Sequence, residues 1–511
     1  MNKKDLIIIA FVFVIGVLSR IPFLEQMQSH WDGPQYSIAI IRYSLEQQTP
    51  APPGYPLYIA MGRAAYFLTN DPHNAILFLN VLFSGLGAIV FYLIGKALFN
   101  RSVGIIATIL FLSGTTFYFF GITAYPYLAI PVISAALGGV VYVIVFRKKK
   151  YGIFLGLTFS FAIAFRPQEV PFITLIFLYG FYHLGSKEKI KAIMSFIFFF
   201  LLWFLPFMRL VGGLGNYIHV SREFLEAGTI SPISVENIRR WVFAIIQGFY
   251  FSFGISSISL FVLIFIKVKN ITRKKIMVFV RKKHVHFYFI WITPSLLFNL
   301  LIRSEHAGYQ GTYISAFLIL ISYSIWYLSK KNMITRCIMI ACIVFFNLFI
   351  FFFNRDPALN KPYRQSSFHY WEIRKNDIRL YSKVTYIKKN FDPKTTMIIT
   401  EPFQWRGIMY HLPEYLTYDI DGIFSSNERF KYIIRKSQYY SYSQEENKSF
   451  IFVIPNNITS VIFTDEDMFS SVNAEKKKKI SLDGNSNITI LSVKEGQKFK
   501  YSINNFSIIS F

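Results

Sequence analysis

The stretch AILFLNVLFSGLGAIVFYLIGKALF, residues 75–99, decides the fold class, because it is apolar over a length that crosses a bilayer and carries one charge, Lys96. Ten further segments share this character, and the fifth and sixth are short enough to leave open whether that hairpin reaches the far surface. The chain is therefore expected to be a polytopic α-helical membrane protein with about 11 transmembrane helices. The predicted segments are Leu6–Leu24, Ala75–Phe99, Val103–Phe120, Leu128–Phe146, Gly152–Phe165, Val170–Leu184, Ile190–Val211, Trp241–Ile266, Val285–Ile302, Thr312–Leu328 and Met333–Phe353.

Composition supports this interpretation. Of the 511 residues, 53% are apolar and 19% aromatic, and the mean hydropathy of +0.39 does not suit a water-soluble surface. The net charge of +26 is compatible with nucleic-acid binding only if the basic residues share one face of a soluble fold. Here they lie in short clusters between the apolar segments, so binding to nucleic acid is not expected and the charges indicate orientation.

Lysine positions predict the orientation of the chain. With a cytoplasmic N-terminus, the lysines before residue 354 lie in the inner loops or at the inner ends of the adjoining segments, and the outer loops contain arginine but no lysine. We therefore expect a transmembrane domain over residues 1–353, with a long first external loop at 25–74, in the cell membrane.

Residues 354–511 lack long apolar runs, and eleven crossings would place them outside. Strand-like runs at Thr396–Thr400, Ser449–Pro455, Ser460–Thr464 and Ile488–Val493 predict a soluble extracytoplasmic α/β domain. The Lys476–Lys479 run is expected to be a solvated loop.

Asp32 is the first candidate for chemistry, in the sequence Ser29-His-Trp-Asp-Gly-Pro-Gln-Tyr36 directly after the first predicted span. Trp31 is a natural interfacial anchor. A carboxylate held at that depth loses hydration, so its basicity should rise, as suits a general base acting on a hydroxyl. The alternative is that Asp32 merely caps a helix that begins at Pro34.

Two further external loops concentrate polar side chains. Phe165-Arg-Pro-Gln-Glu169 lies at the tip of the short hairpin, where buried polar groups are usually functional or paired. The planar fork of Arg166 suits a phosphate, and the alternative is an Arg166–Glu169 ion pair on an ordinary loop. Arg303-Ser-Glu-His-Ala-Gly-Tyr-Gln-Gly311 joins a cation, a carboxylate, an imidazole and a phenol.

A metal site is weakly indicated. Glu305 and His306 together with His30 and Asp32 offer ligands for a divalent cation such as Mg²⁺ or Mn²⁺, although their spacing matches no known ligand pattern. For His306 the alternative is a polar turn with satisfied hydrogen bonds. The sequence leaves metal dependence open.

In combination, these motifs resemble the GT-C superfamily of membrane glycosyltransferases. The resemblance is closer to the prokaryotic branch related to protein O-mannosyltransferases and to the aminoarabinose transferase of lipid A. It rests on the order of several short motifs across the whole chain. These are Trp31-Asp-Gly-Pro-Gln-Tyr36, Pro52-Pro-Gly-Tyr-Pro56, Phe165-Arg-Pro-Gln168, His306-Ala-Gly-Tyr309, Gln404-Trp-Arg406 and Tyr410-His-Leu-Pro413.

The resemblance implies an inverting transfer of a sugar from a polyprenyl-phosphate donor to a hydroxyl of a glycan, lipid or protein acceptor on the outer face. Asp32 would act as the general base. Arg166, with Arg303 and Arg63, would bind the donor phosphate. The remaining candidates for the substrate site are His30, Tyr36, Tyr55, Gln168, Glu169, Glu305, His306 and Tyr309.

A transporter or flippase of lipid-linked sugars is the main alternative from another class. Transporters usually carry polar binding residues or broken helices in the middle of the membrane, often in inverted repeats. In this chain we find the polar candidates in the predicted external loops and see no repeat. An oligosaccharide ligase or polymerase would share the lipid-phosphate chemistry, but not the first loop with its aspartate.

Overall fold

The computed structural model describes residues 2–29, 32–224, 233–269, 282–302, 307–353, 368–400, 405–420, 430–435, 438–443, 450–464, 472–473, 477–494, 498–502 and 505–509. Contacts divide the chain into two compact units. The helical unit comprises Met1–Leu24, Pro52–Leu359 and Gln365–Tyr370. The mixed unit comprises Glu25–Ala51, Asn360–Arg364 and Trp371–Phe511. The first half of the predicted external loop thus groups with the C-terminal residues, and the predicted domain boundary at 353 stays a prediction.

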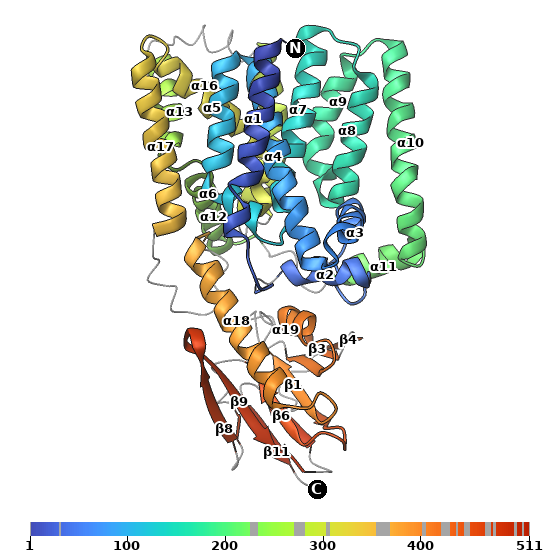
Figure 1. Ribbon diagram of the computed structural model, residues 1–511. Helices are drawn as coiled ribbons and strands as arrows, with labels where there is room; N and C mark the ends of the chain where they lie inside the picture. Colours follow the sequence, from blue (N-terminus) through green and yellow to red (C-terminus); the bar gives the residue numbers. More distant parts are fainter. Residues whose placement is uncertain are drawn as a thin grey trace. The chain divides into compact units, whose positions relative to one another are not determined.

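The helical unit is a bundle of apolar helices (Figure 1). Among the described residues, eight helices are long and apolar enough to cross a membrane. A ninth is obtained if α5 (Arg101–Ser113) and α6 (Thr115–Ile122), bent by 58°, form one span. The eight are α1 (Lys3–Leu18) with η1 (Ile21–Phe23), α4 (Pro72–Leu98), α7 (Ala129–Arg147) with η2 (Pro126–Leu128), α10 (Ser186–Leu210), α12 (Val235–Phe253) with η5 (Gly254–Ser256) and α13 (Ser257–Val268), α15 (Lys283–Leu301), α16 (Gly311–Leu328) with η6 (Ala307–Gln310), and α17 (Met333–Phe353).

All eleven predicted segments are helical, but eleven exceeds the number of full-length spans. The fifth and sixth segments form α8 (Gly152–Phe165) and α9 (Val170–Tyr182), with 14 and 13 residues. At 1.5 Å per residue such helices reach about 20 Å, whereas the hydrocarbon core is about 30 Å thick. Two helices outside the spans, α3 (Pro56–Thr69) and α11 (Leu214–Phe224), complete the unit.

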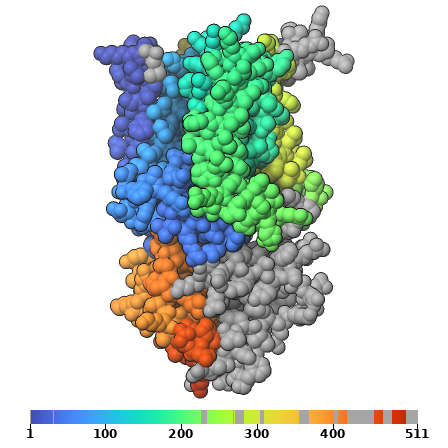
Figure 2. All heavy atoms as spheres, turned by 90° about the vertical axis from the view of Figure 1, so that its right-hand side faces the viewer, coloured from blue at the N-terminus to red at the C-terminus, as the bar shows by residue number. Residues whose placement is uncertain are grey.

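Burial separates inner helices from outer ones. In their most apolar stretches, α4 is 67% and α7 is 83% buried, whereas α10 is 11% buried. Figure 2 shows α10 in green along the outside of the unit. Large apolar side chains that are exposed on a helix long enough to cross a membrane are expected to face lipid. On α10 they are Ile190, Ile193, Met194, Ile197, Phe198, Phe199, Leu201, Leu202, Leu205 and Leu210.

Close helix crossings depend on glycine. A Cβ atom added to Gly16 of α1 would lie 2.8 Å from the Cα atom of Gly85 in α4. Small residues let two helix backbones approach closely, and such crossings are common between membrane helices. This crossing fixes α1 against the inner helix α4.

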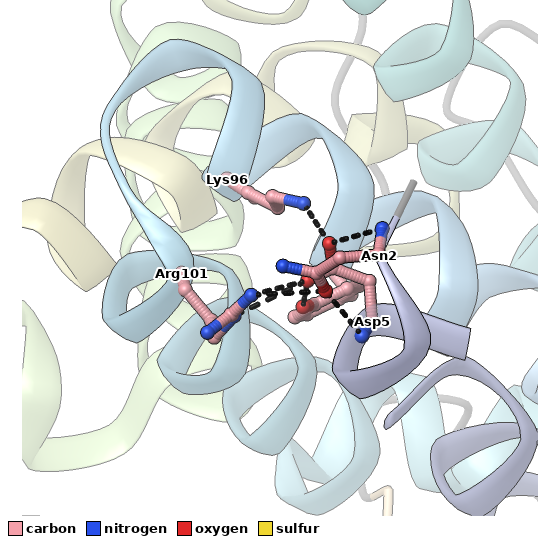
Figure 3. A network of polar contacts seen from close by, with 5 residues as sticks. Asn2, Asp5, Lys96 and Arg101 are labelled. Carbon is pink, nitrogen blue, oxygen red and sulfur yellow. Dashed lines mark hydrogen bonds and ion pairs between the residues drawn. The ribbon is translucent and has the colours of Figure 1, made fainter. Parts of the chain in front are cut away.

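A polar network fastens the beginning of α1 to its neighbours (Figure 3). The Asp5 carboxylate is nearly fully buried and forms ion pairs with Lys96 near the end of α4 and Arg101 at the start of α5. The Tyr92 hydroxyl donates to the same carboxylate at 2.7 Å. A buried carboxylate needs such partners, so the network joins three helices at one end of the unit.

Arg20 is buried close to the bend between α5 and α6. Its Nη2 atom donates to the carbonyl oxygen of Leu112 at 2.8 Å, in the last turn of α5. Its guanidinium lies 3.8 Å from the centre of the Tyr118 ring. The carbonyls in the last turn of a helix lack partners within the helix and carry partial negative charge, so a cation there is favourable.

The described residues of the mixed unit form two sheets and three α-helices, α2 (Gly33–Ile41), α18 (Tyr370–Asn390) and α19 (Trp405–His411). The larger sheet has the order β4-β3-β2-β1-β6-β9-β8, in which β1 is parallel to β2 and β6 and the other pairs are antiparallel. The smaller sheet has the order β5-β10-β11-β7. The strands are β1 (Thr396–Thr400), β2 (Leu416–Ile420), β3 (Phe430–Arg435), β4 (Gln438–Ser443), β5 (Phe450–Val453), β6 (Ser460–Phe463), β7 (Val472–Asn473), β8 (Lys477–Leu482), β9 (Ser486–Ser492), β10 (Lys498–Ser502) and β11 (Asn505–Ile509).

The core of this unit lies between α18, α19 and the larger sheet. Apolar residues of these elements form one buried cluster, and Met27 from the distant segment Glu25–Ala51 belongs to it. The other fully described members are Leu380, Val384, Ile387, Ile398, Ile408, Leu412, Tyr415, Ile462 and Ile488.

The four predicted strands are confirmed as β1, β5, β6 and β9, whereas the expectation of a loop at Lys476–Lys479 is wrong. Residues Lys477–Leu482 form β8 at the edge of the larger sheet. Lys478 and Lys479 are exposed there. Lysines on an edge strand discourage pairing with another chain, which explains a charge run within a strand.

Candidate functional site

Asp32 lies in the mixed unit at the start of α2 (Gly33–Ile41). It occupies the N-cap position, yet its side chain makes no capping hydrogen bond. Its Oδ1 atom instead accepts a hydrogen bond from Gln35 Nε2 at 2.7 Å and lies 3.6 Å from Arg406 Nη1. The carboxylate is therefore directed toward polar side chains, and helix capping does not explain its orientation.

Gln35 links Asp32 to Ala51, the last residue of the segment 25–51. The side chain is buried, with its Nε2 atom donating to Asp32 and its Oε1 atom accepting from the backbone N–H of Ala51 at 2.7 Å. A buried amide with both ends bonded has little freedom to rotate. Gln35 thus fixes the distance between Asp32 and the other end of the loop.

Arg406 reaches Asp32 from α19. Its side chain is 4% exposed, and its Nη2 atom donates to Gln48 Oε1 at 3.1 Å. One guanidinium therefore contacts two positions of the segment 25–51. The sequence motif Gln404-Trp-Arg406 contributed to the family resemblance, but nothing in the sequence linked Arg406 to Asp32.

The backbone just before Asp32 is fixed independently of Arg406. The Asp377 carboxylate on α18 accepts from the backbone N–H groups of Gln26 and Met27 at 2.9 and 3.0 Å. The N–H of Gln28 lies 3.4 Å from His411 Nε2. A Cβ atom on Gly407 would lie 2.8 Å from the carbonyl oxygen of Gln28, so only glycine allows α19 to approach this closely.

The second candidate site lies in the helical unit, at the tip between α8 and α9. Arg166 follows α8, and Glu169 ends the 3₁₀ turn η3 (Pro167–Glu169). Arg166 Nη1 donates to Glu169 Oε1 at 2.6 Å, and each side chain is 6% exposed. The predicted ion pair is thus present, but it is buried and does not belong to an ordinary exposed loop.

Aromatic rings surround the Arg166 guanidinium. It lies 5.0 Å from the centre of the Tyr309 ring and 5.7 Å from that of Tyr127. The Tyr127 hydroxyl donates a hydrogen bond to the Tyr309 hydroxyl at 3.3 Å. The Tyr55 phenol also interacts electrostatically with the guanidinium. Cation–π contacts of this kind stabilise a buried arginine while leaving its N–H donors available.

Two polar atoms at this tip have no hydrogen-bond partner among the described residues. They are Arg166 Nε and Gln168 Oε1, and both are buried. Glu169, in contrast, is fully engaged, because its Oε2 atom accepts from the hydroxyl of Thr312 on α16. Buried polar atoms without partners are rare in proteins and call for an explanation such as a ligand or water. The tip can therefore offer both a donor and an acceptor to an anionic or hydroxylated ligand.

The structure thus brings together some of the sequence candidates. Arg166, Glu169, Tyr55 and Tyr309 share the tip, and Tyr127 and Thr312 join them without a signal in the sequence. Arg63 is half-buried on α3. Tyr36 is buried in α2 of the mixed unit. His30, Arg303, Glu305 and His306 lie outside the described residues.

The metal prediction stays open. In the part of the chain that is described, no group of three or more His, Cys, Asp or Glu side chains is arranged to hold an ion. Three of the four predicted ligands, His30, Glu305 and His306, are not among these residues.

Comparisons with known proteins find similarity of fold, in solved structures, and no match to a family model or a curated protein. ArnT from Cupriavidus metallidurans bound to undecaprenyl phosphate superposes with a TM-score of 0.59 and 9% identity, over 95% of this chain and 97% of that chain. ArnT from the same organism in the apo state gives 0.55 and 8% over the same shares.

An oligosaccharyltransferase from Archaeoglobus fulgidus in the apo form gives a TM-score of 0.49 and 12% identity, over 81% of this chain and 64% of that chain. The agreement with ArnT extends over nearly the full length of both proteins. The chain therefore has the fold of the GT-C transferase ArnT, as the resemblance of its sequence motifs predicted.

Proposed function

We propose that this protein is an integral-membrane glycosyltransferase that moves a sugar from a polyprenyl-phosphate donor to a hydroxyl acceptor on the outer face. The fold shared with ArnT over 95% of the chain carries this proposal, because that structure contains undecaprenyl phosphate. A fold can host several activities, so the assignment also needs residues with fitting chemistry.

Arg166 is proposed to bind the donor phosphate. Its side chain is buried, its Nε atom has no partner among the described residues, and Glu169 together with the tyrosine rings holds it in place. A guanidinium can donate two parallel hydrogen bonds to a phosphate. Tyr309, Tyr55 and Gln168 at the same tip, with Arg63 and Arg303, are proposed as further donor-site residues.

Asp32 is proposed to be the general base. As the acceptor oxygen forms its bond to the anomeric carbon, Asp32 takes the hydroxyl proton. The bond between that carbon and the phosphate oxygen breaks, and its electron pair leaves with the polyprenyl phosphate. Attack opposite to the leaving group inverts the configuration at the sugar. A positioned base contributes about 10²–10⁴ to such a rate.

The outer location is proposed from the lysine pattern and the number of crossings. Among the described residues, counting α5 and α6 as one span gives nine candidate crossings, and a spanning α8–α9 hairpin would give eleven. Both numbers are odd, which supports a topology with the two ends of the chain on opposite sides of the membrane. With a cytoplasmic N-terminus, residues 354–511 would then be extracytoplasmic. A cysteine introduced at Asp392 tests this location, because it should react with a membrane-impermeant thiol reagent in intact cells.

The function is tested by incubating the purified protein with candidate polyprenyl-phosphate sugars and measuring released polyprenyl phosphate. A transferase releases polyprenyl phosphate when it transfers the sugar to an acceptor hydroxyl or to water. A transporter or flippase releases none. Asp32→Asn should fold and insert normally but lose most transfer. Full transfer by this variant would refute the assignment of Asp32 as the general base.

Metal dependence is measured by repeating the transfer assay with EDTA, Mg²⁺ or Mn²⁺.

A further inference from the structure

The contact between α19 and the segment 25–51 gives the C-terminal part of the chain a role at the proposed base. We infer that Arg406 is a positioning residue that holds the Asp32 carboxylate in the orientation needed for proton transfer. The inference rests on the proposed function, in which Asp32 is the base. It concerns residues of the mixed unit only.

The geometry holds one carboxylate oxygen from two directions. Arg406 Nη1 lies 3.6 Å from Asp32 Oδ1, and Gln35 Nε2 donates to the same oxygen at 2.7 Å. Arg406 in turn is anchored through Nη2 to Gln48 Oε1 at 3.1 Å. The guanidinium is a rigid planar fork, so anchoring one of its nitrogens fixes where the other one points.

A purely structural role for Arg406 would duplicate contacts that are already present. The backbone of residues 26–28 is attached to α18 through Asp377 and to α19 through His411. These contacts involve neither Arg406 nor Asp32. Removing the Arg406 side chain should therefore disturb the Asp32 carboxylate more than the path of its segment. Groups that orient a catalytic side chain without touching the substrate act mainly on turnover.

The experiment compares Arg406→Ala and Arg406→Lys with Arg379→Ala in the full-length protein. Arg379 is a matched control, because it is an equally buried arginine of the same unit whose Nε atom donates to the Gly484 carbonyl at 3.1 Å. The loss of a charge-assisted contact predicts that Arg406→Ala lowers kcat about 10- to 100-fold without changing KM for the donor. Arg406→Lys, or added guanidinium ion with Arg406→Ala, should recover part of kcat, and Arg379→Ala should keep kcat per folded protein.

Two results would overturn the inference. One is a normal kcat in Arg406→Ala while Asp32→Asn is inactive, which leaves the proposed function intact. The other is additivity in thermal unfolding. If the two side chains interact, the Tm loss of the double variant Asp32→Asn with Arg406→Gln is smaller than the sum of the single losses. Additive losses would contradict the contact, and this readout needs no activity. A wild-type protein that transfers no sugar would instead refute the proposed function and, with it, this role of Arg406.

Discussion

The hydroxyl of Thr312 donates to the Glu169 carboxylate and thereby ties the start of α16 to the tip of the α8–α9 hairpin. The other oxygen of this carboxylate accepts from Arg166. Glu169 thus links α16 to Arg166, the residue proposed to bind the donor phosphate. The position of the guanidinium depends on a residue that is far away in the sequence.

Replacing Thr312 by valine should lower the free energy of unfolding by about 1.5–3 kcal/mol, because a hydrogen bond to a buried charged group is lost at nearly constant volume. Thermal unfolding of the purified protein in detergent measures this change. Thr312→Ser keeps the hydroxyl and should behave much more like the wild type. A loss in Thr312→Ser together with no loss in Thr312→Val would show that the methyl group, and not the hydrogen bond, matters at this position.

Arg166→Ala should raise KM for the polyprenyl-phosphate donor by about 10-fold or more, because a charge-assisted contact with the phosphate is lost. Arg166→Lys keeps the charge but not the planar fork, so it should recover only part of the affinity. The control is Arg209→Ala, which removes an exposed arginine in the last turn of α10. Donor affinity that does not change in Arg166→Ala would remove Arg166 from the site.

Arg20→Met should destabilise the protein by about 1–3 kcal/mol, because the carbonyl of Leu112 loses the buried guanidinium that donates to it at the bend between α5 and α6. Arg147→Ala offers a comparison, since Arg147 is exposed and its Nη2 atom also donates to a backbone carbonyl, that of Ala97, at 3.3 Å. This second variant should change Tm little. A similar Tm loss in both would indicate that burial of the arginine is unimportant.

Asp5→Asn should lower Tm, because Lys96 and Arg101 then lose the carboxylate that pairs with both of them (Figure 3). Both cations are partly exposed, so the expected loss is modest, about 1–2 kcal/mol. Adding Lys96→Met to Asp5→Asn removes one of the two like charges and should restore part of the Tm. A double variant that is less stable than Asp5→Asn alone would contradict this electrostatic explanation.

Much of the helical unit could be predicted from the sequence, because lipid imposes long apolar runs that are easy to recognise. The sequence predicted one apolar segment over α5 and α6 but gave no sign of the 58° bend between them. The bend at Gly114 depends on tertiary contacts, since a Cβ atom there would lie 2.5 Å from the Ser252 carbonyl oxygen. A hydropathy pattern has no information about such a contact.

In the larger sheet of the mixed unit, the strands predicted from the sequence all lie in the interior. β1 and β6 lie in the middle of this sheet and read as short apolar runs. β4 and β8 are its edge strands, and their sequences, QYYSYS and KKKISL, contain no continuous apolar run. An edge strand is stabilised mainly by backbone pairing on one side, so its sequence is weakly constrained.

The candidate site residues were predicted one at a time, and their partners were not. Asp32, Arg166 and Glu169 stand out in the sequence because they are polar residues beside predicted spans. Tyr127 and Thr312 give no comparable signal, since tyrosine or threonine near a span is ordinary. Arg406 belongs to the motif Gln404-Trp-Arg406, but nothing in the sequence links it to Asp32. Their importance follows from distances between residues remote in the sequence, such as Asp32 and Arg406.

The membership of Met27 in the core of the mixed unit has a consequence for biogenesis. Gln26 and the Asp377 carboxylate that it contacts are separated by 351 positions, so the segment leaves the ribosome long before its binding surface has been synthesised. A truncated chain ending after the last span would leave that segment without its support. A fragment beginning at residue 354 would lack a piece of its own interior, so the C-terminal region matures only together with a peptide that is synthesised about 350 residues earlier.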